Sequence, residues 1–194
     1  GWDDLRRRLQ PDRRCFAFFH PQLPGEPLIF VEVALVSHMA KNVADLINKQ
    51  APVGDPKSFK AAIFYSISNC QPGLRGVSLG NFLIKRVAQK LIEDIPTLKM
   101  FSTLSPIPGF TQWLDAGAAL PEEKLSSAQQ RKWHEAKNSL SIGSLSWAER
   151  LKNGWHPERS DPHEKTPLMR LCALYLMHKT PEPQGDAVGK FHLS

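Results

Sequence analysis

The sequence predicts an α+β (mixed α/β) fold, in which helices flank a central mixed sheet. A helical insertion is expected between elements of this core. In the first half of the chain, short apolar runs rich in β-branched and aromatic residues alternate with amphipathic helical segments. From Thr111 to Lys165 the sequence turns polar, is dotted with tryptophan and is broken by glycine and proline. The length of 194 residues suffices for one domain with a well-packed core, or for one domain with a satellite.

A hairpin is predicted near the start of the chain. Two apolar, β-rich runs, Cys15–Phe19 and Leu28–Leu35, flank a turn over Pro21–Gly25 that contains proline and glycine. A helix is predicted from Ser37 onward, because four apolar residues recur there at helical spacing: Met39, Val43, Leu46 and Ile47.

A strand–helix–strand unit follows the hairpin. Its strands cover Ala61–Asn69 and Leu98–Leu104, and its helix covers Asn81–Ile95. The helix is expected to bury one face, on which Leu83, Val87 and Leu91 recur every four residues.

The helical insertion is expected at about 111–165. Apolar spacing predicts short helices within it over Ala128–Asn138 and Leu145–Leu151. We interpret the insertion as an excursion between elements of the core.

A further helix is predicted after the insertion. Thr166 and Pro167 give it a start signal, an N-cap threonine before a proline at the first helical position. The helix itself, Leu168–Met177, is apolar nearly all round, which predicts burial. A loop over 181–190 then leads to Phe191–Leu193, which reads as the beginning of a strand.

Composition and charge narrow the function classes. The net charge of +6 and the pI of about 9.3 favour a phosphate-bearing partner, because basic surfaces attract phosphates. The arginines at 6–8 and 13–14 form only a short cluster without interleaved aromatics, so we expect a small molecule and no nucleic acid. No apolar run approaches the roughly 20 residues of a membrane helix, and no spacing predicts a metal site. Three cysteines, Cys15, Cys70 and Cys172, are expected to be reduced thiols.

A glycine-rich turn precedes the helix of the strand–helix–strand unit. Its glycines let the backbone turn tightly, and the free amides and positive dipole end of the helix favour an anion. The stretch Arg75-x-x-Ser78-x-Gly80 resembles the pyrophosphate loop of the GNAT acetyltransferases, with serine in place of the middle glycine. Taken alone, the turn is equally compatible with a strand-to-helix connection that binds nothing. The residues expected to hold a pyrophosphate are Arg75, Gly76, Val77, Ser78, Leu79, Gly80 and Asn81.

Longer segments, along nearly the whole chain, resemble the malonyl-CoA decarboxylases. They are Gly25–Leu28, Ala62–Ser68, Gly76–Val87, Phe101–Phe110 and Thr166–Ala173. The run Ser-Pro-Ile-Pro-Gly-Phe in the fourth segment is the most specific part. The resemblance implies a GNAT-like fold for residues 1–194, coenzyme A as the carrier of the substrate and no metal or organic cofactor. It also implies a homo-oligomer when an N-terminal helical domain is present.

Two departures from the family pattern affect the interpretation. The helical domain is absent, and the chain stops at Ser194. In the family, further strands complete the sheet and contribute a tyrosine, so we expect a partial catalytic domain. The family's phosphate loop often carries an acid where Ser78 stands, and no role of that acid is carried over.

The resemblance implies a carboxy-lyase that converts malonyl-CoA to acetyl-CoA and carbon dioxide. Loss of carbon dioxide leaves an enolate on the thioester, which needs hydrogen-bond donors and then a proton. By resemblance, His192 protonates the enolate, and Ser105 is its partner at the malonyl carboxylate or the relayed proton. A histidine suits proton donation because its ordinary pKa is about 6.5. From spacing alone, Ser105 would merely begin a turn, and His192 would be incidental on an apolar strand.

Two other functions would use the same features. A GNAT-type acyl-CoA N-acyltransferase would share the loop and the fold, but it needs a base for an amine and a channel for the acceptor. A non-catalytic acyl-CoA-binding module would not need both Ser105 and His192. We expect an intracellular, cytoplasmic protein, with the mitochondrial or peroxisomal matrix open if the source is eukaryotic. The start has no signal-type apolar stretch, and the end is not a Ser-Lys-Leu tail.

Overall fold

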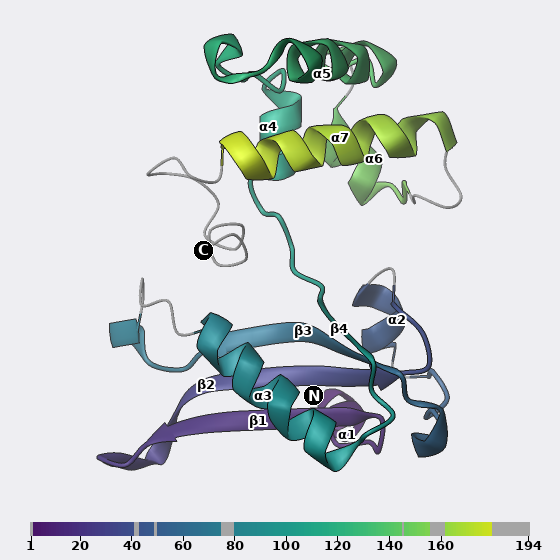
Figure 1. Cartoon of the computed structure of the whole chain (residues 1–194). Coiled ribbons are helices and arrows are strands. Elements are labelled where there is room, and N and C mark those ends of the chain that lie inside the picture. Colours follow the sequence, from purple (N-terminus) through teal and green to yellow (C-terminus); the bar gives the residue numbers. More distant parts are fainter. Residues whose placement is uncertain are drawn as a thin grey trace. The chain divides into compact units, whose positions relative to one another are not determined.

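The computed structural model describes residues 2–40, 43–48, 50–74, 80–144, 146–155 and 162–179. These residues confirm the mixed α+β class, with helices flanking a sheet (Figure 1). The chain divides into two compact units, one up to Ser105 and one from Pro106 onward. Each unit has a hydrophobic core of its own.

The first unit is built on a mixed sheet, which has four strands within the described residues. They are β1 (Arg13–His20), β2 (Leu23–Val36), β3 (Ala61–Asn69) and β4 (Met100–Thr103), in that order across the sheet. β2 is antiparallel to both of its neighbours, whereas β4 is parallel to β3. The helices are α1 (Trp2–Arg8), α2 (Val43–Ile47) and α3 (Gly80–Asp94), with short 3-10 turns η1 (Pro56–Ser58) and η2 (Pro72–Leu74).

Both faces of the sheet are packed. α3 covers one face and buries its predicted apolar residues, Leu83, Val87 and Leu91, among the strand residues of the core. On the other face a smaller cluster joins Leu46 of α2 to small and branched strand residues, namely Ala34, Ala61 and Ile63. A sheet covered on both faces explains why β2 and β3 read as continuous apolar runs.

The predicted strand–helix–strand unit is confirmed, and the segments before it differ in their bounds. β3 has the predicted bounds, and β4 is shorter at both ends than the predicted Leu98–Leu104. In the hairpin, β2 already begins at Leu23, so the predicted turn Pro21–Gly25 was too long. The helix predicted from Ser37 was also wrong at its start, since residues 37–40 are not helical and α2 spans only five residues. β2 pairs with β3 up to Val36, and the chain passes through a bend after it before α2 begins at Val43.

The second unit is helical within the described residues. It comprises α4 (Phe110–Asp115), the 3-10 turn η3 (Glu122–Lys124), α5 (Ser127–Ser139), α6 (Trp147–Lys152) and α7 (Pro162–His178). Trp113, Trp133 and Trp147 are buried in its core. Their indole N–H groups donate to the carbonyls of Ala119, Ala118 and Leu140 at 2.9, 3.0 and 3.3 Å. These three tryptophans of the polar stretch are therefore core residues, each with its polar atom satisfied.

α7 differs from its prediction in its first residue and in its burial. It begins at Pro162, so Thr166 is not its N-cap and Pro167 lies inside the helix. The extra first turn is held by Glu164, which accepts from Arg150 at 2.6 and 2.9 Å and from the indole of Trp155 at 2.7 Å. The expected all-round burial was also wrong. The helix buries one face with Leu171, Leu174 and Tyr175, whereas Met169 is 63% and Met177 is 49% exposed.

Candidate active site

Two predicted site segments follow the carboxyl ends of the parallel strands β3 and β4. They are the phosphate turn, which follows β3, and Ser105, which follows β4. β3 leads through residues 70–79 to α3, and α3 leads back to β4, which pairs with β3 from Ala61↔Met100 to Phe64↔Thr103. The segments that leave the carboxyl ends of parallel strands emerge at one edge, which is the usual ligand-binding edge of such units. β3 ends at Asn69, and the segment after β4 leaves the sheet earlier, beside Phe64 of β3 (Figure 1).

β3 continues past the end of β4. Phe64 is the last residue of β3 that pairs with β4, yet β3 extends to Asn69 and stays paired with β2. Cys70 donates its amide to the carbonyl of Leu28 on β2 at 2.8 Å, so Cys70 faces β2. Because alternate residues of a strand face the same neighbour, Ile67 and Asn69 direct their backbone groups to the opposite edge. On the side of β3 that faces away from β2, no strand within the described residues pairs with this part, which leaves an open edge beside the end of β4.

The predicted phosphate turn lies mostly outside the described residues. Residues 75–79 belong to that part, so the phosphate-binding roles of Arg75 to Leu79 stay predictions. Gly80 and Asn81 are the first two residues of α3. The helix has 15 residues, so its N-terminus carries the full dipole end that the anion-site argument requires.

Of the two predicted catalytic residues, the structure describes Ser105 but not His192. Ser105 is an exposed residue that follows β4 directly, one residue after Leu104, whose amide donates to the carbonyl of Phe64 at 2.9 Å. The structure thus fixes where Ser105 leaves the sheet. His192 lies outside the described residues, and its pairing with Ser105 stays a prediction.

A buried ion-pair network lies at the start of β1. Asp12 is 4% exposed, and its carboxylate accepts from Arg7 at 2.7 and 3.1 Å and pairs with Arg13 at 3.1 Å. Burial alone would raise the pKa of Asp12, but the hydrogen bond from Arg7 and the charges of Arg13 and Arg7 outweigh it and lower that pKa. Arg13 also donates to the carbonyl of Leu46, which ties β1 to α2.

The network continues across the same face of the sheet to Glu32 and Tyr65. Glu32 is 7% exposed and pairs with Arg8 at 2.7 Å. The Tyr65 hydroxyl donates to Glu32 and accepts from Arg13. Burial and the nearby negative charge of Glu32 raise the pKa of Tyr65 to about 12, so the phenol keeps its proton at neutral pH.

Sequence reasoning did not find this network. Glu32 lies within an apolar strand and is buried, with partners on two other elements. The signal was a single acid within the apolar run Val31–Leu35, which requires buried partners if the strand is covered on both faces. Those partners come from residues far apart in the chain, so the pairing is visible only in three dimensions.

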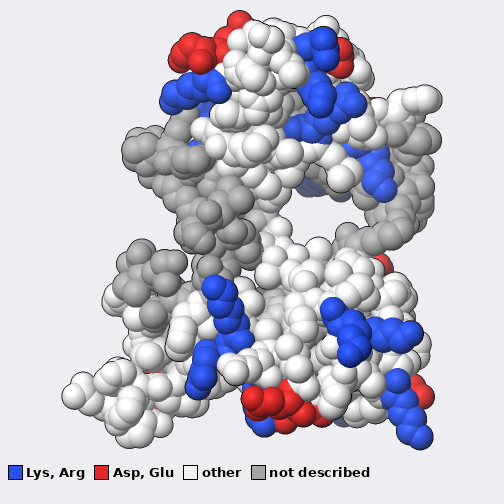
Figure 2. All heavy atoms as spheres, in the orientation of Figure 1, with Lys and Arg blue, Asp and Glu red and all other residues white. Residues whose placement is uncertain are grey.

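The network also explains the basic cluster near the start of the chain. Arg7 and Arg13 are buried and paired with Asp12, and Arg8 is paired with Glu32. On the face drawn in Figure 2, basic side chains lie in separate groups with acidic side chains among them. The arginine cluster is therefore largely a structural feature of the first unit.

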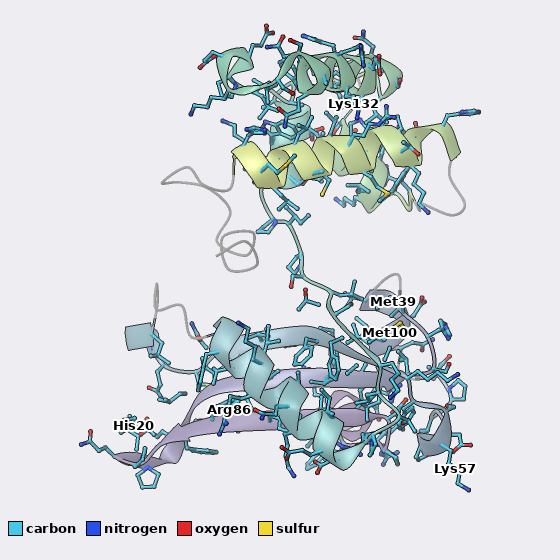
Figure 3. The ribbon with its side chains drawn as sticks, in the orientation of Figure 1. His20, Met39, Lys57, Arg86, Met100 and Lys132 are labelled. Carbon is cyan, nitrogen blue, oxygen red and sulfur yellow. The ribbon has the colours of Figure 1, made fainter. Side chains whose placement is uncertain are left out.

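A groove between β1 and α3 lies at the β1 edge of the sheet, which is the edge opposite β4. It encloses about 350 Å³ and is lined by Phe16, Phe18, Arg86, Val87, Gln89, Lys90 and Glu93. Arg86 is labelled on α3 in Figure 3. β1 and β4 are opposite edges of the sheet, so this groove is separate from the open edge of β3.

The described residues show no metal cluster and no membrane helix. None of the groups formed by His, Cys, Asp or Glu in this part of the chain brings three potential metal ligands together. No helix there is long and apolar enough to span a bilayer.

Comparison with known proteins identifies the family. A family model described as "Malonyl-CoA decarboxylase C-terminal domain" matches residues 1–194. The chain belongs to the malonyl-CoA decarboxylase family. It is 39% identical to a protein of Anser anser anser and 37% identical to a protein of Mus musculus, both named "Malonyl-CoA decarboxylase, mitochondrial". Each match covers 100% of this chain, but only 40% and 41% of the respective relative.

Solved structures of malonyl-CoA decarboxylases share the fold. The protein from Cupriavidus metallidurans is 43% identical with a TM-score of 0.69, and the match covers 99% of this chain and 47% of that one. The protein from Agrobacterium vitis is 40% identical with a TM-score of 0.68, over 100% of this chain and 45% of that one. The chain thus spans less than half the length of the malonyl-CoA decarboxylases that it resembles.

Proposed function

We propose that this chain carries the catalytic part of an enzyme that converts malonyl-CoA to acetyl-CoA and carbon dioxide. The observation that carries the proposal is the match of all 194 residues to the C-terminal domain of malonyl-CoA decarboxylases. The parallel strand–helix–strand unit supports it, because the unit offers a helix N-terminus, an open strand edge and Ser105 at one edge of the sheet.

In this proposal the three features bind successive parts of the substrate. The pyrophosphate of coenzyme A lies on the backbone amides of residues 75–81, at the N-terminus of α3. The amide-containing arm of coenzyme A then runs along the open edge of β3, where Ile67 and Asn69 offer backbone groups to an extended ligand. This path carries the thioester toward the end of β4 and Ser105.

The chemistry then needs no electron sink beyond the thioester. The developing enolate requires a hydrogen-bond donor, and a well-placed oxyanion donor is worth about 3–4 kcal/mol in the transition state. We assign His192 as the proton donor and Ser105 as its partner at the malonyl carboxylate or the relayed proton. An imidazole with a pKa of about 6.5 can hold and release a proton near neutrality.

Two finer points belong to the same proposal. The protein acts inside the cell, where coenzyme A thioesters occur, and the goose and mouse relatives are named mitochondrial. A homo-oligomer accompanies the helical domain that the family resemblance implies.

The deciding experiment is incubation of the complete protein with malonyl-CoA, with acetyl-CoA and carbon dioxide measured together. Equal amounts of both products, formed without any acceptor, are expected. A parallel reaction with an amine acceptor separates the alternatives. Acyl transfer to the amine without release of carbon dioxide would contradict decarboxylation, and binding of malonyl-CoA without either reaction would indicate a binding module.

A further inference from the structure

β3 carries a β-bulge at the point where β4 ends. On one side of it Val33 of β2 pairs with Phe64, and on the other side Glu32 pairs with Ser66, so Tyr65 is the extra residue. Phe64 is also the last residue of β3 that pairs with β4. The bulge therefore separates the part of β3 that pairs with β4 from the part whose edge is open. Bulges re-aim the strand that follows them and are over-represented next to active sites.

The side chain of the bulge residue is held from both sides. The Tyr65 hydroxyl donates to the carboxylate of Glu32 on β2 and accepts from Arg13 on β1. Arg13 is itself fixed by the carbonyls of Asp12 and Leu46, at 2.8 and 2.5 Å. The Tyr65 ring packs against the same apolar cluster as Leu104, the residue before Ser105.

Stabilisation of the fold alone does not explain why this buried network is present. A buried ion-pair network is on average no more stable than well-packed apolar residues of similar volume, whereas breaking one of its pairs is strongly destabilising. A buried hydrogen-bonded network does, however, restrict the geometry of the groups that it joins. The network here joins β1, β2 and the bulge of β3, which is the junction between the sheet and the proposed substrate path.

We propose that Tyr65 and Glu32 are positioning residues for the proposed decarboxylase site. Glu32 acts through Tyr65 to hold the bulge in one shape. The bulge in turn sets the direction of the open β3 edge relative to Leu104 and Ser105. This inference rests on the proposed function, and it adds two residues that do not touch the reacting atoms.

A direct acid role for Tyr65 does not fit the same observations. Its hydroxyl is already engaged by Glu32 and Arg13, and its raised pKa of about 12 keeps it protonated at neutral pH. A phenol with a pKa so far above neutrality is a weak proton donor, which favours a role in orienting its neighbours.

The test compares four variants of the complete protein by kcat and KM for malonyl-CoA. Tyr65→Phe and Glu32→Leu should each lower kcat by about tenfold to a hundredfold, because small misplacements of reacting groups cost that much. KM should change by less than about threefold, since the contacts to the phosphates are untouched. Glu32→Gln keeps an acceptor for the Tyr65 hydroxyl and should retain most of the activity. The double variant Tyr65→Phe with Glu32→Leu should lose little more than either single variant.

Thermal unfolding separates positioning from a purely structural role. A lowered melting temperature with normal kcat in Tyr65→Phe and Glu32→Leu would overturn the proposal, and so would fully additive losses in kcat. Lys90→Met, which breaks the exposed pair with Asp94 on α3, is the matched control and should change neither quantity.

Hydrogen exchange tests the pair without any assay of turnover. The Leu104 amide donates across the β3–β4 junction, so it should exchange faster in Tyr65→Phe and Glu32→Leu than in the wild type. Unchanged exchange at Leu104 would overturn the positioning role. If the wild-type protein does not decarboxylate malonyl-CoA, the proposed function fails, and this measurement still decides whether the pair fixes the junction.

Discussion

The backbone amide of Leu104 donates to the carbonyl oxygen of Phe64 at 2.9 Å, and β3 and β4 part at this bond. Ser105 is the next residue, and Pro106 follows it. Proline fixes its own φ and restricts the residue before it to extended conformations. The position of Ser105 is thus defined by a backbone hydrogen bond on one side and a stiff residue on the other, which suits a group that must hold a hydroxyl in place.

Removal of the Ser105 hydroxyl tests its assignment. Ser105→Ala should lower kcat by about a hundredfold or more and change KM far less, because the contact strengthens mainly in the transition state. His192→Asn should act in the same way, and the double variant should lose little beyond the worse single variant. Ser127→Ala, at an exposed first-turn position of α5, is the control. Fully additive losses would mean independent roles, and near-normal turnover in His192→Asn would exclude it as the proton donor.

Charge reversal at the predicted phosphate turn should weaken substrate binding. Arg75→Glu puts a negative charge beside the pyrophosphate, so KM for malonyl-CoA should rise while kcat changes little. Arg131→Glu on α5 makes the same charge change at a side chain that is 73% exposed and should leave KM unaltered. A ligand-bound structure with the phosphates on the arginines of residues 6–14 would contradict the prediction.

Decarboxylation should not require a metal ion. The thioester accepts the charge of the enolate, and the sequence contains no set of ligands at a credible spacing. Full activity is expected after exhaustive dialysis against a chelator, measured as carbon dioxide released per minute. Activity that is lost and then restored by zinc or magnesium would show that the proposed site is wrong.

The sequence predicted the elements that rest on local pattern. β3 and α3 were found nearly to the residue, because a long apolar run and a four-residue repeat of Leu83, Val87 and Leu91 leave little ambiguity. The start of α7 was misjudged because Thr166 and Pro167 form a good local start signal. Contacts of Glu164 with Arg150 and Trp155 support an earlier turn instead.

The candidate site was predictable only in part. Ser105 came from the family resemblance, and its place after β4 follows from the strand prediction. The roles of Glu32 and Tyr65 could not be predicted, because they depend on a bulge and on pairing between three strands. Neither the position of a bulge nor the register of a sheet is encoded in a short run of residues.

Acid should weaken the first unit through Asp12. Its pKa in the folded protein is lowered below the ordinary value of 3.8, so its stabilising effect is complete above that value and is lost as pH falls through the folded pKa. Asp12→Asn should lower the free energy of unfolding at pH 7 by about 3 kcal/mol, because Arg7 and Arg13 lose a buried partner. It should also flatten the dependence of stability on pH below about 4. Urea unfolding at several pH values measures both effects, and Asp94→Asn, in an exposed pair, is the control. An unchanged pH profile in Asp12→Asn would contradict the account.

The second unit should depend on Asp115, the last residue of α4. Its carboxylate accepts from the amides of Trp147 and Ala148 at 2.7 and 3.3 Å, so it satisfies the first amides of α6 from another helix. Asp115→Ala leaves those amides without this acceptor and should cost about 1–2 kcal/mol, the usual cost of a lost helix cap. Four of the five tryptophans lie in this unit, so tryptophan fluorescence during urea unfolding reports on it.

Glu123→Gln, at an exposed position of η3, removes a carboxylate of the same unit and should leave the unfolding midpoint unchanged. The midpoint of Asp115→Ala should fall, while the unfolding of the first unit, followed by hydrogen exchange in β2 and β3, should stay as in the wild type. Equal midpoints for Asp115→Ala and the wild type would show that Ser146, whose hydroxyl accepts from the amide of Glu149 at 3.2 Å, is a sufficient cap for α6 by itself.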